Sequence, residues 1–251
     1  MYDTGIVIER NTEFDPFAAV YNRFWGAEYH EQAFPIVEKL LLSRLPARAA
    51  VLDVCCGTGQ FTARVEERGF RVYGIDASER MIGHARRNAP GAEFCVADAR
   101  CFSLYQKLDA AYSVFESLNH IPDAEGLGMA FACIRRHLGR GALFLFDLNR
   151  EEAFVNYWND THAIVEDDCV CALRSHYEEE ARTATCDITV FQLEDGWKRS
   201  DFTIRQTCHD VKQVHESLLE AGFGSVSLYD SRDAGMSGDI ACARTFFLAT
   251  V

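Results

Sequence analysis

Two glycines and three acidic residues stand where short apolar runs of the sequence end. In the run VLDVCCGTGQ, an apolar stretch containing Asp53 passes into a turn that holds Gly57 and Gly59. Such a turn lets the backbone approach a ligand closely, and the amides at the start of the following helix favour an anion. Asp76 and Asp98 end the next two apolar runs, where a carboxylate can accept hydrogen bonds from a ribose diol. The spacing predicts that all three acids face one nucleoside-binding crevice.

The glycine turn departs from the dinucleotide-binding pattern at two positions. That pattern has a third glycine for close helix packing, and Thr62 stands there instead. Asp53, just before the turn, would repel the two charges of a pyrophosphate. Both departures disfavour an NAD-dependent oxidoreductase, and the acid favours a ligand that carries positive charge.

The elements that must position these residues alternate along the chain. Near-continuous apolar runs separated by amphipathic segments are typical of a parallel sheet covered on both faces. The expected strands are 50–54, 70–75, 92–96, 109–115 and 142–146, and the expected helices are 60–68, 79–88 and 124–138. Ser78 suits an N-cap, and Gly139 is expected to end the third helix.

A period of two replaces this alternation over residues 150–205, which predicts an antiparallel meander with a turn at Glu194-Asp195-Gly196. A helix at 209–221 and strands at 225–229 and 243–251 then resume the first pattern, so the meander is an insert. Before the sheet, residues 14–45 are expected to be helical.

Three segments together resemble the motifs of class I S-adenosylmethionine-dependent methyltransferases. They are LDVCCGTG at 52–59, GIDASERMI at 74–82 and VADA at 96–99, and the resemblance covers residues 45–150. It implies a doubly wound α/β fold, with a mostly parallel seven-stranded Rossmann-like sheet, helices on both faces and the antiparallel β insert. It also implies S-adenosylmethionine as cofactor.

The resemblance assigns roles to residues at the predicted crevice. Gly57 and Gly59 would line the methionine part and Asp76 would hold the ribose hydroxyls. Asp98 with Ala99 would bind the adenine edge, while Met81 is either an adenine contact or a core methionine. The implied cofactor-binding residues are Tyr21, Tyr29, Asp53, Cys55, Gly57, Thr58, Gly59, Asp76, Ala77, Met81, Asp98, Ala99 and Phe115.

The aromatic segment 21–29 is similar to the N-terminal lid of small-molecule methyltransferases, including sugar N-methyltransferases. Aromatic faces suit a methylsulfonium cation, although these rings could equally pack on the core. The expected division is an N-terminal helical lid at 1–46, a cofactor-binding domain at 47–149 and 206–251, and an acceptor-side insert at 150–205.

The acceptor side is expected after the fourth strand, in SVFESLNHIP. His120 is the candidate general base or acceptor ligand, and the alternative is a loop histidine bonded to the backbone. Glu116 is expected to be an exposed turn carboxylate rather than a group that attracts a cationic acceptor. In the insert, His176 and Tyr177 face either the acceptor pocket or a dimer interface. The acids 178–180 are expected to form a solvated strand edge.

Composition limits the partners. The 251 residues carry a formal charge of −13, of which residues 150–205 hold 13 acidic against six basic side chains. A large basic nucleic-acid footprint is therefore excluded, and the Asn-Pro-Pro-aromatic signature of nucleobase methyltransferases is absent. No apolar run is long enough to span a membrane. The N-terminus lacks the features of a signal peptide.

The ten cysteines include no CxxC pair, so no metal site is expected. The cysteines are expected to be reduced thiols of a cytoplasmic protein. The sequence thus predicts a cytoplasmic monomer or homodimer with no nucleic-acid or membrane partner. It would transfer a methyl group to a small-molecule acceptor, with an amine among the candidates. The alternatives are a non-catalytic cofactor-binding regulator and methylation of a protein side chain.

Overall fold

The computed structural model describes residues 14–251, which form two sheets. Seven strands make the larger sheet, in the order β10-β11-β5-β4-β1-β2-β3. β11 runs antiparallel to β10 and β5, and the remaining neighbours are parallel. The strands β6-β7-β8-β9 make a separate antiparallel sheet. The predicted α/β fold with an antiparallel insert is confirmed.

The element bounds lie close to those expected. The strands are β1 (Ala50–Val54), β2 (Arg71–Asp76), β3 (Glu93–Val96), β4 (Leu108–Ser113), β5 (Leu138–Asn149), β6 (Thr161–Val165), β7 (Cys169–Glu178), β8 (Thr183–Leu193), β9 (Trp197–Thr207), β10 (Ser225–Asp230) and β11 (Arg244–Thr250). The α-helices are α1 (Ala18–Phe24), α2 (Ala27–Leu40), α3 (Gln60–Glu67), α4 (Glu79–Asn88), α5 (Ala124–His137), α6 (Glu151–Tyr157), α7 (Val211–Glu220) and α8 (Ser231–Ala234).

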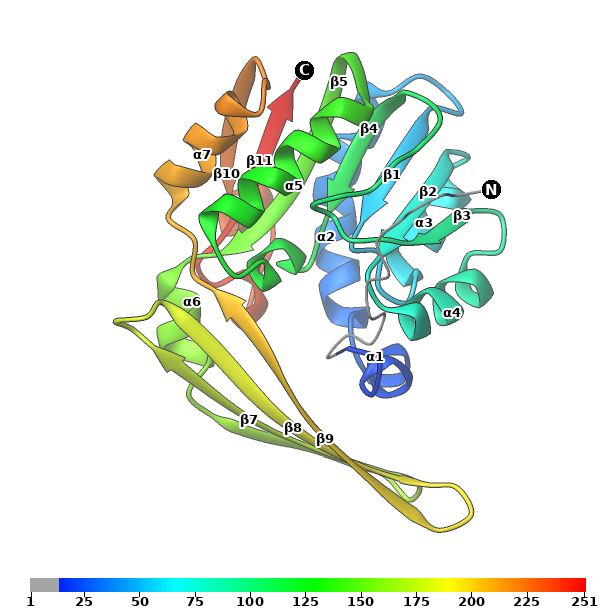
Figure 1. Ribbon diagram of the computed structural model, residues 1–251, viewed down its shortest axis with the longest axis vertical. Coiled ribbons are helices and arrows are strands. Elements are labelled where there is room, and N and C mark those ends of the chain that lie inside the picture. Colours follow the sequence, from blue (N-terminus) through cyan, green and yellow to red (C-terminus); the bar gives the residue numbers. More distant parts are fainter. Residues whose placement is uncertain (1–13) are drawn as a thin grey trace.

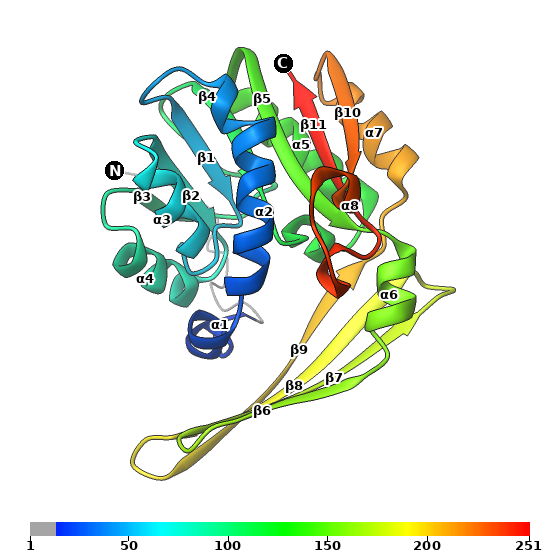
Figure 2. The same ribbon diagram turned by 180° about the vertical axis from the view of Figure 1, so that it is seen from behind.

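Helices cover both faces of the seven-stranded sheet. Alternate residues of a strand point to opposite faces, so Leu52 of β1 joins the core beneath α5 and α7 while Val51 joins the core beneath α2 and α3. Figures 1 and 2 show these two helical layers from the front and from behind. Because both faces of the sheet are covered, β1, β4 and β11 near its centre are buried along nearly their whole length.

Several element boundaries differ from the expectation. The N-terminal helix is broken, because Gly26 adopts a left-handed backbone (φ 90°) between α1 and α2. α5 ends at His137 and β5 begins at Leu138, so Gly139 lies in the strand and does not end the helix. The short helices α6 and α8 were not expected. The first 13 residues of the predicted lid, and the N-terminus judged not to be a signal peptide, lie outside the described residues.

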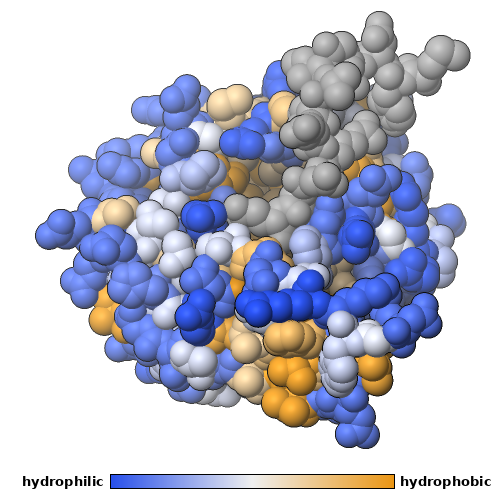
Figure 3. All heavy atoms as spheres, turned by 60° about the horizontal axis from the view of Figure 1, so that its bottom comes forward, coloured by the Kyte–Doolittle hydropathy of each residue, from blue (hydrophilic) through white to orange (hydrophobic). Residues whose placement is uncertain are grey.

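The four-stranded sheet lies beyond the carboxyl ends of the parallel strands, with α1 on the same side (Figure 1). Phe17, the N-cap of α1, and Val20 within it pack with residues of β7 and β8 in one apolar cluster. Arg23 of α1 forms an ion pair with Asp168 at 2.7 Å. Figure 3 looks onto this end, where apolar atoms lie within a mostly hydrophilic periphery. No helix among residues 14–251 is long and apolar enough to cross a membrane.

Candidate active site

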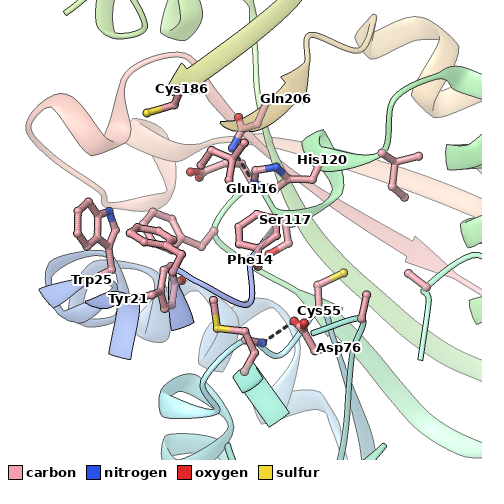
Figure 4. A pocket seen from close by; sticks show the side chains of 18 of the residues that line it. Phe14, Tyr21, Trp25, Cys55, Asp76, Glu116, Ser117, His120, Cys186 and Gln206 are labelled. Carbon is pink, nitrogen blue, oxygen red and sulfur yellow. Dashed lines mark hydrogen bonds between the residues drawn. The ribbon is translucent and has the colours of Figure 1, made fainter. Parts of the chain in front are cut away.

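A cavity of about 750 Å³ lies between the carboxyl ends of the parallel strands, α1 and the four-stranded sheet. Ligands bind at this end of doubly wound sheets. Ten of the residues predicted from the sequence line it: Tyr21, Cys55, Gly57, Asp76, Ala77, Met81, Asp98, Ala99, Phe115 and His120. Figure 4 shows Cys55 and Asp76 on one side of the cavity, and His120, Gln206 and Cys186 on the other. We call the first side the donor end and the second the acceptor end.

The glycine turn forms one wall of the donor end. Gly57 (φ 53°) lines the cavity, and Cys55 is also left-handed (φ 60°). Gly59 does not line the cavity. A Cβ there would lie 2.7 Å from the Cα of Ala85 in α4, so Gly59 allows close packing of the start of α3 against α4 rather than close approach to a ligand.

Asp76 is held by the turn that it faces. Its Oδ2 accepts a hydrogen bond from the Gly57 backbone amide, and its Oδ1 accepts one from the Ser78 amide, both at 2.9 Å. Ser78 in turn caps α4 by accepting from the Met81 amide, as predicted. Burial raises the pKa of Asp76 to about 6, although the two backbone bonds oppose the shift. The carboxylate is therefore fixed in place at the cavity wall.

Asp98 lines the same end but already has a cationic partner. Arg100 donates to both of its carboxylate oxygens, the shortest contact being 2.6 Å from Nη2 to Oδ2. Burial disfavours the Asp98 carboxylate, but the bonds from Arg100 outweigh it and hold the pKa of Asp98 below its usual range. Both residues line the cavity.

The structure corrects the expectation that Asp53 faces this crevice with the other two acids. Because it follows Leu52 in an alternating strand, its side chain turns to the opposite face, beneath α3. There it is buried, and its Oδ2 accepts from the Thr62 hydroxyl at 2.5 Å and from the Tyr112 hydroxyl at 2.8 Å. Burial raises the pKa of Asp53 to about 7. Thr62, where a dinucleotide site has glycine, thus satisfies a buried acid. Asp53 and Thr58 instead border a small adjoining hollow of about 30 Å³.

The two tyrosines of the aromatic segment occupy different places. Tyr21 lines the cavity, where burial and then the charges of Glu116 and Asp76 raise its pKa. Tyr29 does not line it. It lies behind Phe115, with the two rings stacked at 4.4 Å, and its hydroxyl donates to Asp147 at 2.9 Å. Met81 is buried in the protein, as a core methionine would be, and it also forms part of the cavity wall.

His120 lies at the acceptor end of the cavity and is bonded to the backbone, as in the second alternative predicted for it. Its Nδ1 donates to the Arg205 carbonyl at 2.6 Å, which leaves Nε2 to accept from the Gln206 amide at 3.2 Å. Burial lowers the pKa of His120 to about 4. The imidazole is consequently neutral at neutral pH, and its remaining lone pair is engaged by Gln206.

Glu116 is buried, which overturns its expected place as an exposed turn carboxylate. Its side chain is 13% exposed and forms an ion pair with Arg244, which also pairs with Asp147. Sequence reasoning missed this cluster, although an arginine and an aspartate within the apolar strands β11 and β5 were a signal that charges meet in the core. Glu116 lines the cavity.

The insert supplies the acceptor end through other residues than expected. His176 is exposed and Tyr177 packs on Phe154, and neither lines the cavity. Of the acids 178–180, which are all exposed, Glu178 ends β7 and the other two lie in the turn before β8, so they do not run along a strand edge. The insert residues that do line the cavity are Tyr157, Trp158, His162, Ile164, Leu173, Ser175, Cys186 and Ile204. Gln206, which lines it too, lies just past the expected end of the insert, in the same strand β9.

Comparison with known proteins agrees with the fold. A family profile described as "Methyltransferase domain" matches residues 51–141. The chain is a class I S-adenosylmethionine-dependent methyltransferase. The predictions of an enzyme and of S-adenosylmethionine as its cofactor are confirmed.

Among its relatives, the chain is 28% identical over 226 residues to dTDP-3-amino-3,4,6-trideoxy-alpha-D-glucopyranose N,N-dimethyltransferase of Streptomyces venezuelae, covering 88% of this chain and 94% of the relative. The crystal structure of Streptomyces venezuelae DesVI aligns with a TM-score of 0.75 and 26% identity, over 93% of this chain and 97% of that one. The sugar N-methyltransferase KedS8 from Streptoalloteichus shares the fold, with a TM-score of 0.77 and 20% identity over 100% of this chain and 97% of that one.

Proposed function

We propose that the chain transfers a methyl group from S-adenosylmethionine to the nitrogen of a small-molecule amine, with both bound in the cavity between α1 and the insert. The observation that carries this proposal is one continuous cavity whose donor end is lined by Asp76 and whose acceptor end is lined by residues of the insert sheet. The names of two relatives, both amino-sugar N,N-dimethyltransferases, support an amine acceptor.

The donor end fits the cofactor by the chemistry of its groups. Asp76 is a fixed carboxylate with lone pairs to accept the two ribose hydroxyls. Met81 and Ala99 offer apolar surface for the adenine, and Asp98 offers an acceptor for its amino group. Gly57 lets the methionine part approach the backbone, while Tyr21 presents an aromatic surface beside it. When bound, S-adenosylmethionine supplies an electrophilic methyl group on a sulfonium.

At the acceptor end, the residues of the chain position the amine and exclude water. His120 and Gln206 are linked to each other and to β9, so they form a rigid wall. Because His120 is neutral, it places no positive charge beside the amine and the sulfonium. With both ring nitrogens engaged, it is suited to orienting the amine rather than to acting as a base. Alignment of the amine with the methyl group can by itself supply a large part of the rate acceleration of methyl transfer.

The proposed activity is tested by incubating the protein with S-adenosylmethionine and a panel of primary amines and amino sugars. Mass spectrometry should detect a methylated amine together with S-adenosylhomocysteine. A matched panel of alcohols serves as the control for the nucleophile. Methylation of alcohols but no amine would refute the nitrogen acceptor, and no transfer to any member of either panel would refute the proposed function.

The affinity for S-adenosylhomocysteine is expected to fall as the pH drops below about 6, the pKa of Asp76 in the cofactor-free protein. Below that pH the carboxylate is protonated and accepts the ribose hydroxyls less well, so the affinity declines toward about tenfold per pH unit. The stability change has the opposite sign: because folding raises this pKa, the contribution of Asp76 to stability is largest at low pH and is lost as the pH rises through about 6.

Titration calorimetry between about pH 5 and about pH 8 measures this dependence. The Asp76→Asn variant, which cannot ionise, should lose the decline. An equally steep decline in both proteins would assign the titration to another group.

We also propose a cytoplasmic location, because all ten cysteines are free thiols, which suits a reducing compartment. The formal charge of −13 supports the absence of a nucleic-acid partner. The chain is proposed to act as a monomer or a homodimer, with its small-molecule acceptor and without a membrane partner.

A further inference from the structure

Glu116 is held in an unusual conformation at the boundary between the two ends of the cavity. It and the preceding Phe115 both have left-handed backbones, with φ of 44° and 64°. Non-glycine residues seldom adopt such angles, and two in succession persist only where the surroundings fix them. Here Asp147 accepts a hydrogen bond from the Glu116 backbone amide at 3.1 Å, and the ring of Tyr29 stacks on that of Phe115. The strain brings the Glu116 carboxylate to the cavity wall.

Glu116, Asp147 and Arg244 form a cluster in which two acids share one cation. Arg244 is the single cation that contacts both Glu116 and Asp147. Asp147 is fully buried and accepts bonds from Tyr29, the Glu116 amide and Arg244. Its lone pairs are therefore used. Glu116, which pairs with Arg244 through Oε2 and whose pKa is raised by burial, is the acid of the cluster that lines the cavity.

The described residues that line the rest of the cavity offer no unpaired arginine or lysine to match a phosphate. Among the described residues that line it, Arg100 is the only arginine or lysine, and it is bound by Asp98 at the donor end. The insert side presents mainly apolar surface, including Trp158, Ile164 and Ile204. A diphosphate placed there would meet the Glu116 charge in a low-dielectric site with no compensating group.

From this charge pattern we infer the acceptor class: an amine carried on an apolar body that has no phosphate, whose ammonium group is bound by Glu116. The inference rests on the proposed function and goes beyond it, because the two N,N-dimethyltransferases among the relatives are named for dTDP-linked amino sugars. Glu116 would recognise the ammonium as its counter-ion and take up one of its protons, which leaves the nitrogen with a lone pair for methyl transfer. The apolar insert residues would bury the body of the molecule.

The test is a binding comparison on protein saturated with S-adenosylhomocysteine. Calorimetry would use pairs of arylalkyl and alicyclic primary amines with their matched alcohols, together with thymidine diphosphate. The best amine is expected to bind at least about tenfold more tightly than its alcohol, and thymidine diphosphate should neither bind nor compete. Glu116→Gln should bring amine and alcohol to nearly equal affinity. Glu28→Gln, which removes a carboxylate from the exposed side of α2, should keep the preference.

Glu116→Gln leaves Arg244 paired with Asp147, and an unchanged affinity for S-adenosylhomocysteine verifies that the variant is folded. The comparison of amine with alcohol on the unaltered protein needs no variant. Equal binding of amines and alcohols, no binding of any amine, or tight binding of thymidine diphosphate would overturn the inference. Methylation of a dTDP-linked amino sugar alone would do so too, while leaving the proposed function standing.

Discussion

Replacing Asp76 by alanine is expected to weaken the binding of S-adenosylhomocysteine by about 100-fold or more. The substitution would remove two hydrogen bonds from the ribose hydroxyls to the charged carboxylate, each worth about 1.5 kcal/mol or more. It would also release the Gly57 and Ser78 amides, whose bonds of 2.9 Å fix the turn and the start of α4. Both losses act in the same direction, because a loosened turn binds the methionine part less well. Titration calorimetry gives the affinity directly.

The matched control is Glu79→Ala, which removes an exposed acid three positions further along the chain and outside the cavity. It should bind S-adenosylhomocysteine with an affinity within about threefold of the unaltered protein. An Asp76→Ala protein that keeps its fold and binds as tightly as this control would refute the assignment of Asp76 to the ribose.

The Arg244→Met substitution should lower the free energy of unfolding by about 3–5 kcal/mol, the usual cost of removing one partner from a buried ion pair. Arg244 and Asp147 are 4% and 0% exposed at their side chains. Without the guanidinium, Asp147 and Glu116 would face each other as two buried carboxylates. Urea denaturation monitored by fluorescence measures the change.

Neutralising the acids should separate this charge effect from the loss of packing. The triple variant Glu116→Gln, Asp147→Asn and Arg244→Met has no buried charge in the cluster, so it should recover at least about half of the lost stability. A single Arg244→Met variant that loses less than about 1 kcal/mol would contradict the view that one cation holds this cluster together.

The sequence predicted the larger sheet well because its strands are buried on both faces and contrast sharply with the helices between them. β1 and α4 were predicted with their observed bounds, since a glycine turn and the Ser78 cap mark their limits. The break at Gly26 was missed because apolar periodicity continues across it. The short helices α6 and α8 contain too few turns to produce a periodic signal.

The donor end was largely predictable, because the ends of adjacent parallel strands must meet at one edge of a sheet. That rule placed Asp76 and Asp98 correctly in the cavity wall. It failed for Asp53, whose side chain points to the other face of its strand and beneath α3. A shift of one position in an alternating strand moves a side chain to the other face of the sheet. The approximate strand bounds that a sequence gives therefore do not determine which face Asp53 occupies.

The acceptor end was less predictable, because its contacts join residues far apart in the chain. Arg244 meets Asp147 across 97 positions, and His120 meets Arg205 across 85. The twist of the insert decides that Ser175 and Gln206 face the cavity while Tyr177 packs on α6. Local composition carries no information on such pairings until the two sheets are placed together.

A crystal structure of the protein with S-adenosylhomocysteine and an amine acceptor tests the central claim most directly. The account predicts that the ribose hydroxyls bond to Asp76, that the sulfur faces the acceptor end, and that the amine nitrogen lies between the sulfur and Glu116. A ribose bound away from Asp76, or an amine nitrogen on the far side of the insert from the sulfur, would contradict it.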